Sequence, residues 1–196
     1  MKRISLQVIV ALFSTISFAQ SGTKFTVTKN LTKGWNIIGY FGNTTQQVNS
    51  ALKDIWTQVE TVKDMERFCN TGGPELFNGL DTLRLGAGYL VKVKNNCTLS
   101  YSGCVPDRYS APRTQEYTFT RNLKKGWNLI SYYGYVAQPI DKALEPIWND
   151  VEIVKNMDYF YQKGQPAALN TLDSLRIGQG YFIKVSNNCT LTMAGC

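Results

Sequence analysis

The sequence predicts an α+β protein made of two tandem copies of a small, antiparallel-rich β domain, each with about five strands and one or two short helices. The main observation is an internal repeat. Residues 25–104 align without a gap to residues 117–196 at an offset of 92, and 41 of the 80 aligned positions are identical. Within each copy, stretches of alternating apolar and polar residues flank one stretch of helical periodicity.

The repeat divides the chain into a first domain, residues 25–104, and a second domain, residues 117–196. Residues 105–116 contain two prolines and form the predicted linker, which we expect to be semi-extended. Each copy has about the minimum length for a domain with its own core. We therefore expect two separately folding domains, joined like beads on a short string.

The N-terminus predicts a secretory signal peptide over residues 1–19. A basic start is followed by an apolar run at 6–13 that is too short to span a bilayer, and by small residues before a cleavage point near Ala19. Later segments are not continuously apolar enough to cross a membrane. We therefore expect a secreted or cell-surface protein without a membrane span.

The strand pattern begins at residues 25–28 and continues after a predicted hairpin turn in which Gly34 adopts a positive φ. Gly126 is its counterpart in the second copy. Residues 35–41 are apolar on both alternating sides, which predicts a strand covered on both sides and central in its sheet. Further strands are predicted at the segments 59–65, 89–93 and 97–101.

A helix is predicted where the apolar period changes, because five apolar residues fall on one helical stripe. In the first copy these are Val48, Ala51, Leu52, Ile55 and Trp56. The second copy has the same stripe, but Pro146 should end its regular helix near Leu144.

Two elements of each copy resemble a secreted bacterial and archaeal repeat that starts with Gly-Trp-Asn-Leu-Ile-Ser and ends with a Gly-x-Gly-Tyr element and a closing strand. The start occupies residues 34–39 and 126–131, and the Gly-x-Gly-Tyr element occupies 86–89 and 178–181. The resemblance covers nearly all of both copies and implies extracellular proteins without established catalytic residues. This chain departs from the pattern at Gly39, where serine is usual, and by a cysteine pair in each copy.

Five cysteines indicate a disulfide in each copy. An internal bridge in the second copy must join Cys189 to Cys196, and by duplication Cys97 to Cys104. Residues seven apart on a straight strand lie roughly 23 Å apart, so such a bridge requires a bend. Pairing elsewhere remains the alternative. Cys69 is left over as a thiol, either buried or forming an intermolecular link.

The chain lacks histidine, which excludes Ser-His and Cys-His nucleophiles and histidine metal sites. No phosphate loop or dinucleotide motif is present, so we expect no catalytic residues, metal or cofactor. A small glycan-acting enzyme is the weakest alternative, using carboxylates that both copies share. These are Glu60 and Asp81, with Glu152 and Asp173 as counterparts.

Twenty-one basic against fourteen acidic residues give a net charge of +7, reduced to +5 once Lys2 and Arg3 are removed with the signal peptide. The basic residues are scattered, so we expect no nucleic-acid partner, while an acidic surface polymer stays open as an alternative partner.

The tryptophans admit two interpretations. Trp35 and Trp127 either fill the core or form stacking platforms for a sugar ring, and the pattern favours the core. Asn36 and Asn128 are expected to bind turn backbone rather than a ligand. Positions where the copies differ are the better binding candidates, because the second copy gains tyrosines. These candidates are Tyr133, Tyr135, Tyr159 and Tyr161.

We therefore expect a non-catalytic secreted tandem module that binds an extracellular glycan or surface protein, mainly through its second domain. The alternative is a structural subunit or spacer of an extracellular assembly, self-associating through sheet edges or Cys69.

Overall fold

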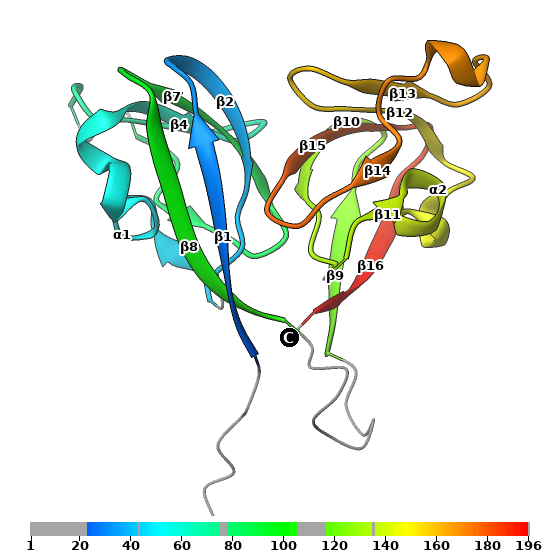
Figure 1. Ribbon diagram of the computed structural model, residues 1–196, viewed down its shortest axis with the longest axis horizontal. Coiled ribbons are helices and arrows are strands. Elements are labelled where there is room, and N and C mark those ends of the chain that lie inside the picture. Colours follow the sequence, from blue (N-terminus) through cyan, green and yellow to red (C-terminus); the bar gives the residue numbers. More distant parts are fainter. Residues whose placement is uncertain (1–22, 43, 75–77, 106–116, 135, 196) are drawn as a thin grey trace, which may run out of the picture.

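The computed structural model describes residues 23–42, 44–74, 78–105, 117–134 and 136–195 (Figure 1). It is mostly β structure with a few short helices, and each pair of strands in the described part of the chain is antiparallel. The predicted signal peptide and linker lie outside the described residues, apart from Val105. Below, the first half means residues 23–105 and the second half residues 117–195.

The first half contains a four-stranded sheet, a long two-stranded ribbon and a short two-stranded sheet. The four-stranded sheet has the order β2 (Gly34–Gly39), β7 (Gly88–Val93), β4 (Val59–Lys63), β5 (Phe68–Asn70). The ribbon pairs β1 (Thr23–Leu31) with β8 (Cys97–Val105), and the short sheet pairs β3 (Gln46–Gln47) with β6 (Thr82–Leu83). Helix α1 (Val48–Ala51) and a 3₁₀ segment (Lys53–Gln58) follow β3.

The second half has the same strand order. Its four-stranded sheet is β10 (Gly126–Ser131), β15 (Gly180–Val185), β12 (Val151–Lys155), β13 (Phe160–Gln162). The ribbon pairs β9 (Tyr117–Leu123) with β16 (Cys189–Gly195), and β11 (Gln138–Pro139) pairs with β14 (Ser174–Leu175). Helix α2 (Ile140–Ala143) and 3₁₀ segments at Glu145–Ile147 and Ala167–Leu169 complete it.

Each core lies on one side of the four-stranded sheet, beneath the ribbon and the helical segment. Ile38, Val62, Tyr89 and Val91 project from the first sheet into this core, and Leu99 projects from the ribbon. In the second half the equivalent positions fill a second cluster. The predicted helical stripe is buried, but regular helix covers only its first turn. In the second half the helix ends at Ala143, one residue before the predicted stop.

The predicted hairpin turn is present in both halves, with φ of +97° at Gly34 and +96° at Gly126. The Asn36 side chain holds this turn as expected. Its Oδ1 accepts a hydrogen bond from the Thr32 N–H at 3.0 Å, and its Nδ2 donates to the Thr32 carbonyl at 2.7 Å. Asn128 makes the same pair of bonds with Lys124.

The two halves contact each other directly through backbone hydrogen bonds. The Gly39 N–H donates to the Gly178 carbonyl at 3.1 Å, and the Ser131 N–H donates to the Gly86 carbonyl at 2.9 Å. The offset of 92 relates these bonds, so the contact has a local twofold axis. The Phe41 and Tyr133 rings, also equivalent positions, meet with centroids 4.8 Å apart.

The two halves are therefore packed against each other and do not lie apart like beads on a string, although each has a core of its own. Tyr133 is fully buried in the hydrophobic cluster of the first half, and Ile177 also packs against that cluster. The expected central position of the strand at 35–41 is wrong. β2 is an edge strand, and Ile37 is buried because Gly180 of the other half lies against it.

In each half, the Gly-x-Gly-Tyr element packs closely against the other half. At Gly86, φ is +71° and a β-carbon would collide with the Phe119 ring; at Gly178, φ is +70° and it would collide with Val27. A β-carbon on Gly88 would lie 2.6 Å from the Ile130 carbonyl oxygen. Tyr89 itself is buried, and its hydroxyl accepts the Arg84 N–H at 2.7 Å. The glycines thus allow two backbones to approach closely.

Two cations are enclosed at this contact. Lys29 donates a hydrogen bond to Gln179 of the other half, and burial lowers the pKa of Lys29 from 10.5 to about 8 despite the nearby Asp158. Its counterpart Arg121 lies near Tyr89 and Asp64 of the first half, and burial lowers its pKa as well.

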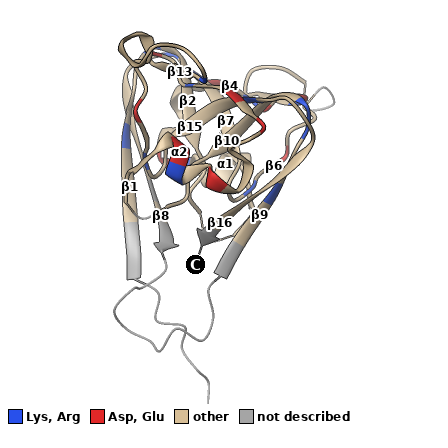
Figure 2. Ribbon diagram, turned by 90° about the vertical axis from the view of Figure 1, so that its right-hand side faces the viewer, with Lys and Arg blue, Asp and Glu red and all other residues tan. Residues whose placement is uncertain are grey.

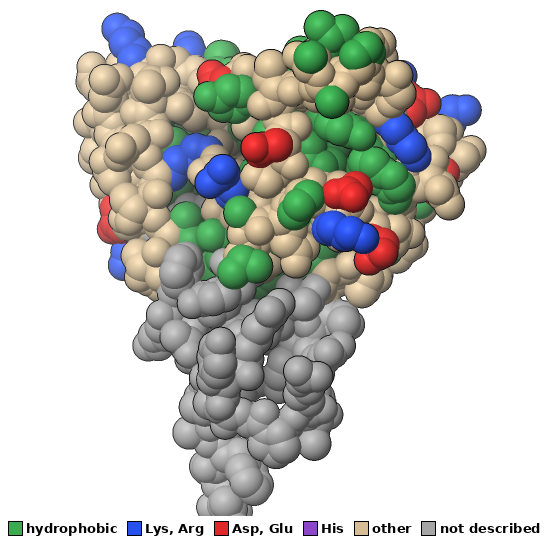
Figure 3. Space-filling view, turned by 45° about the vertical axis from the view of Figure 1, so that its right-hand side comes forward, with side chains coloured by type: hydrophobic (Ala, Val, Ile, Leu, Met, Phe, Trp, Pro, Cys, Tyr) green, Lys and Arg blue, Asp and Glu red, His purple; other side chains and the backbone are tan. Residues whose placement is uncertain are grey.

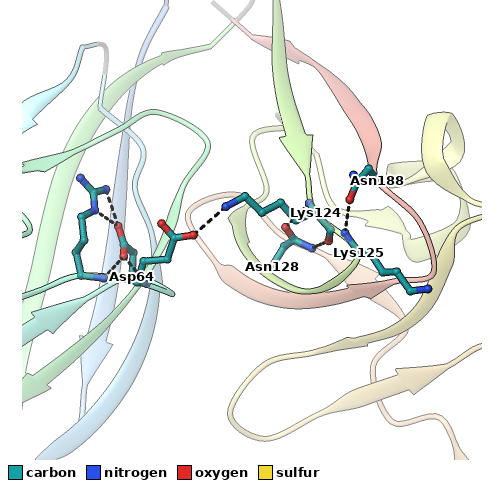
Figure 4. Close-up of polar contacts among 7 residues, drawn as sticks. Asp64, Lys124, Lys125, Asn128 and Asn188 are labelled. Carbon is teal, nitrogen blue, oxygen red and sulfur yellow. Dashed lines mark hydrogen bonds and ion pairs between the residues drawn. The ribbon is translucent and has the colours of Figure 1, made fainter.

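An exposed ion pair extends the contact. Lys124 Nζ lies 3.0 Å from Glu66 Oε1, in the turn after β4 that Asp64 organises (Figure 4). Its exposure means that it contributes little to stability.

The proposed internal disulfides are contradicted. Cys97 and Cys189 are free thiols, and burial raises the pKa of both. Cys97 and Cys104 lie near opposite ends of β8, which pairs with β1 in unbroken register, so no bend brings them together. Cys196 lies outside the described residues. Cys69 is a half-buried thiol in β5, packed against the first core.

The contact explains why residue 39 is glycine, and this can be tested. A β-carbon at Gly39 would collide with Ser131 Oγ and with the Gln179 carbonyl oxygen. We expect Gly39→Ser to lower the free energy of unfolding by about 1–3 kcal/mol, and we expect the exchange variant Gly39→Ser/Ser131→Gly to recover part of that loss, because it removes the collision with Ser131 Oγ but not the one with the Gln179 carbonyl oxygen. Urea denaturation measures both. Equal stability of the single and exchange variants would contradict the shared-space explanation.

Lys29 predicts an alkaline rise in stability. Below pH 8 the lysine is protonated in both the folded and the unfolded chain, so the cost of burying its charge is fully present. Between pH 8 and 10.5 the folded chain loses this proton first, and the free energy of unfolding should rise by about 2 kcal/mol between pH 7 and 9.5. In Lys29→Met the rise should be absent and stability at pH 7 higher. A parallel pH profile for both proteins, measured by urea denaturation, would refute this.

Candidate functional site

The best candidate site is the side of each four-stranded sheet that faces away from its own core. We call it the Trp face. In the first half, strand register places Trp35 beside Lys92, and Ile37, Leu90, Lys63 and Phe68 in a row across the four strands. In the second half the corresponding residues are Trp127, Lys184, Leu129, Phe182, Lys155 and Phe160.

The first Trp face combines an exposed indole with charges. Trp35 is 39% exposed, and Phe68 on the edge strand is 41% exposed. Lys63 Nζ lies 5.0 Å from the centroid of the Trp35 ring, which is a cation–π distance. Beside it, Lys92 Nζ and Glu60 Oε2 form an ion pair of 2.7 Å, and the hydrogen bond from Lys92 lowers the pKa of Glu60.

The second Trp face repeats this arrangement with more aromatic surface. Trp127 is 38% exposed, and Lys155 Nζ lies 4.8 Å from its ring centroid. Phe182 replaces Leu90 and meets Trp127 edge-on at 6.3 Å. Lys184 and Glu152 form the equivalent ion pair, also at 2.7 Å.

A shallow hollow of about 380 Å³ lies on the second Trp face. Its lining includes Glu152, Ile153, Gln162 and Lys184. Strand register puts three of these lining residues, Lys184, Ile153 and Gln162, in one row with Trp127, although Trp127 itself does not line the hollow.

The two Trp faces meet at one end. Gly88 and Gly180 lie on them, and β-carbons there would point at Leu129 and Ile37 of the opposite face. In Figure 1 the two sheets lie in the upper half of the molecule on either side of this contact. Trp35 and Trp127 lie at the other ends of β2 and β10, where the strands leave the contact and become exposed.

The surface near these sheets carries both signs of charge. Figure 2 shows ribbon segments of basic and acidic residues near one another along the upper part of the molecule, around β4 and β13. Figure 3 shows hydrophobic side chains gathered on the side of the second half that faces the viewer, with basic and acidic side chains at their margin.

The core assignment of Trp35 and Trp127 is therefore wrong. Sequence alternation correctly places Trp35 on the same side as Ile37, but that side is buried by the other half only as far as Ile37. The second tryptophan of each half behaves more nearly as expected, because Trp56 and Trp148 are partly buried against the two cores.

The three predicted binding tyrosines within the described residues, Tyr133, Tyr159 and Tyr161, do not form a cluster. Tyr133 is completely buried against Phe41, so its assignment as a binding residue is wrong. Tyr161 projects to the core side of β13 and packs on Trp148 at 5.8 Å. Tyr159 is 53% exposed in the turn before β13, and Tyr135 lies outside the described residues.

Sequence reasoning missed the lysines of the Trp faces. A signal was present, because Lys63, Lys92 and Glu60 recur unchanged at Lys155, Lys184 and Glu152. Their proximity to the indoles depends on strand register, which the sequence does not specify.

In the described part of the chain, no cluster of three potential ligand side chains has the proximity to hold a metal ion. The helices there also lack the length and apolar character needed to cross a membrane.

Comparison of the chain with protein-family models, curated proteins and solved structures found no match. The resemblance to the secreted Gly-Trp-Asn repeat therefore remains a prediction.

Because Tyr133 is buried and Tyr159 is exposed, alanine substitution of these two residues should have different effects on stability. We expect Tyr133→Ala to lower the free energy of unfolding by about 3–5 kcal/mol, because it removes a buried ring from the contact between the halves. Tyr159→Ala should change it by less than about 0.5 kcal/mol. Urea denaturation with fluorescence detection measures both, and a stable Tyr133→Ala protein would contradict the burial of this ring.

Proposed function

We propose that this protein is a non-catalytic, secreted binding module built from two tandem copies of one domain, and that it binds an extracellular glycan through its Trp faces. The observation that carries the proposal is the pair of exposed indoles, Trp35 and Trp127, each in the same setting of lysines and one glutamate.

Both indoles remain partly exposed to solvent, although burying them would stabilise the protein. Burying a ring of this size stabilises a small domain by a few kcal/mol, so two rings almost 40% exposed at equivalent positions favour a use in binding. Because they lie on a sheet, their positions are fixed by strand register. A fixed ring loses little conformational entropy when a ligand stacks on it.

The polar surroundings favour a glycan over a protein partner. A protein interface of standard size needs about 800 Å² per partner around an apolar centre. The Trp faces instead alternate apolar rings with ammonium, carboxylate and amide groups. In the row from Trp127 to Gln162, two of the four side chains are polar. A sugar ring has the same alternation of apolar face and hydroxyl rim.

The carboxylates support a binding role rather than glycoside cleavage. Cleavage requires a carboxylic acid that holds its proton near neutral pH. The hydrogen bond from Lys92 instead lowers the pKa of Glu60, so this group is ionised at neutral pH and serves as an acceptor.

The proposal predicts which substitutions weaken binding. We expect Trp35→Ala and Trp127→Ala each to lower affinity for the glycan found by array screening about tenfold, or about 1.4 kcal/mol, with little change in Tm. Isothermal titration and thermal melting measure the two effects.

Trp56→Ala is the matched control, since Trp56 is half-buried against the first core. It should lower Tm and leave affinity unchanged. If no glycan binds, or if both indole variants bind normally, glycan binding through the Trp faces is wrong. Concentration-dependent or reducible oligomers on size exclusion would then favour the structural-subunit alternative.

A further inference from the structure

We propose that the ligand is an anionic polysaccharide whose carboxylate or sulfate groups pair with the ammonium groups of Lys63 and Lys155. This inference rests on the proposed function and specifies its ligand class. It follows from the distribution of charge on the two Trp faces.

The lysines of each Trp face fall into two kinds. Lys92 and Lys184 are each compensated by a glutamate at 2.7 Å. Lys63 and Lys155 form no ion pair with an acidic side chain in the described part of the chain, and they lie over the indoles instead. Each Trp face thus keeps one uncompensated positive charge, and that charge lies next to the proposed stacking ring.

The position of these ammonium groups is constrained. Lys63 occupies a β4 position paired with Leu90 on one side and Phe68 on the other, so apolar side chains flank its stem. Lys155 lies within 4.8 Å of the Trp127 centroid and 5.7 Å of the Phe182 centroid. The aromatic rings thus hold each ammonium beside the surface on which a sugar would stack, where it can meet an anionic substituent.

One sugar unit can therefore stack on the indole and pair its anionic group with the adjacent lysine. A pyranose ring on the indole places its substituents at the ring edge, within reach of a lysine side chain. A carboxylate or sulfate there makes a charge-assisted hydrogen bond to the ammonium. Because both halves carry the same pair of groups, a polymer with regularly spaced anionic groups engages both and gains avidity.

Matched polymers that differ only in charge test this. Polygalacturonate and its fully methyl-esterified form provide the carboxylate comparison, and dextran sulfate and dextran provide the sulfate comparison. We expect at least one anionic member to bind more than tenfold tighter than its neutral partner at low salt, and we expect added salt to weaken it. The arm that binds identifies the anionic group.

Lysine substitutions distinguish a specific binding site on the Trp faces from general electrostatic attraction to a positively charged protein. Lys63→Gln/Lys155→Gln should reduce binding of the anionic polymer more than tenfold. Lys63→Arg/Lys155→Arg should retain it, because arginine keeps the charge and the ring contact. Lys53→Gln/Lys142→Gln lowers net charge equally in the helical segments and should change affinity less than twofold.

Tight binding of the neutral polymers, unaffected by Lys63→Gln/Lys155→Gln, would overturn the anionic preference and leave the glycan proposal standing. Equal losses in the two glutamine pairs would overturn the specific site. Binding of no glycan in the array or in these four polymers would overturn both proposals.

Discussion

The structure depends on one close approach of backbone to backbone, where the two halves exchange hydrogen bonds between Gly39 and Gly178 and between Ser131 and Gly86. Ordinary sheets form bonds of this length with side chains present, so the bonds alone do not require glycine. The glycines at 86, 88, 178 and 180 are required because a β-carbon at these positions would collide with atoms of Phe119, Ile130, Val27 and Ile37, respectively, in the opposite half. The same contact buries Ile37 and leaves Trp35 outside, so it determines where each Trp face begins.

Residues near a local twofold axis encounter their own counterparts, and this explains some differences between the halves. Residues 39 and 131 share one small space, which holds the hydroxymethyl group of Ser131 only because residue 39 has no side chain. At 41 and 133 the two rings touch, and only the second has a hydroxyl. Away from the axis, equivalent side chains do not compete for space, so differences there reflect each half's own surroundings.

The sequence was sufficient for some of the local structure. The Gly34 turn and the role of Asn36 each follow from a few neighbouring residues. The length of the helix does not, because it ends at Ala51 in the first half, where no proline follows, just as it ends at Ala143 in the second. The sequence was also insufficient wherever burial came from the other half. Periodicity shows that the strand containing Ile37 has apolar residues on both sides, but it does not show what covers each side. The same limit made Trp35 look like core, and made the charged neighbours Lys63 and Lys92 look like ordinary surface residues.

The internal sequence repeat also bears on the Trp faces. Of 80 aligned positions 41 are identical, so 80 − 41 = 39 have changed between the two segments. Five members of the Trp face nonetheless match in both, namely Trp35, Glu60, Lys63, Phe68 and Lys92 with their counterparts. Other members differ between the halves, such as Leu90, whose counterpart is Phe182, and Thr61, whose counterpart is Ile153. Core packing does not account for this, because these side chains lie on the side of the sheet away from the core. The proposed binding of one kind of ligand by both Trp faces accounts for this match, because under that proposal the indole, the ammonium above it and the adjacent ion pair contact the ligand as a group.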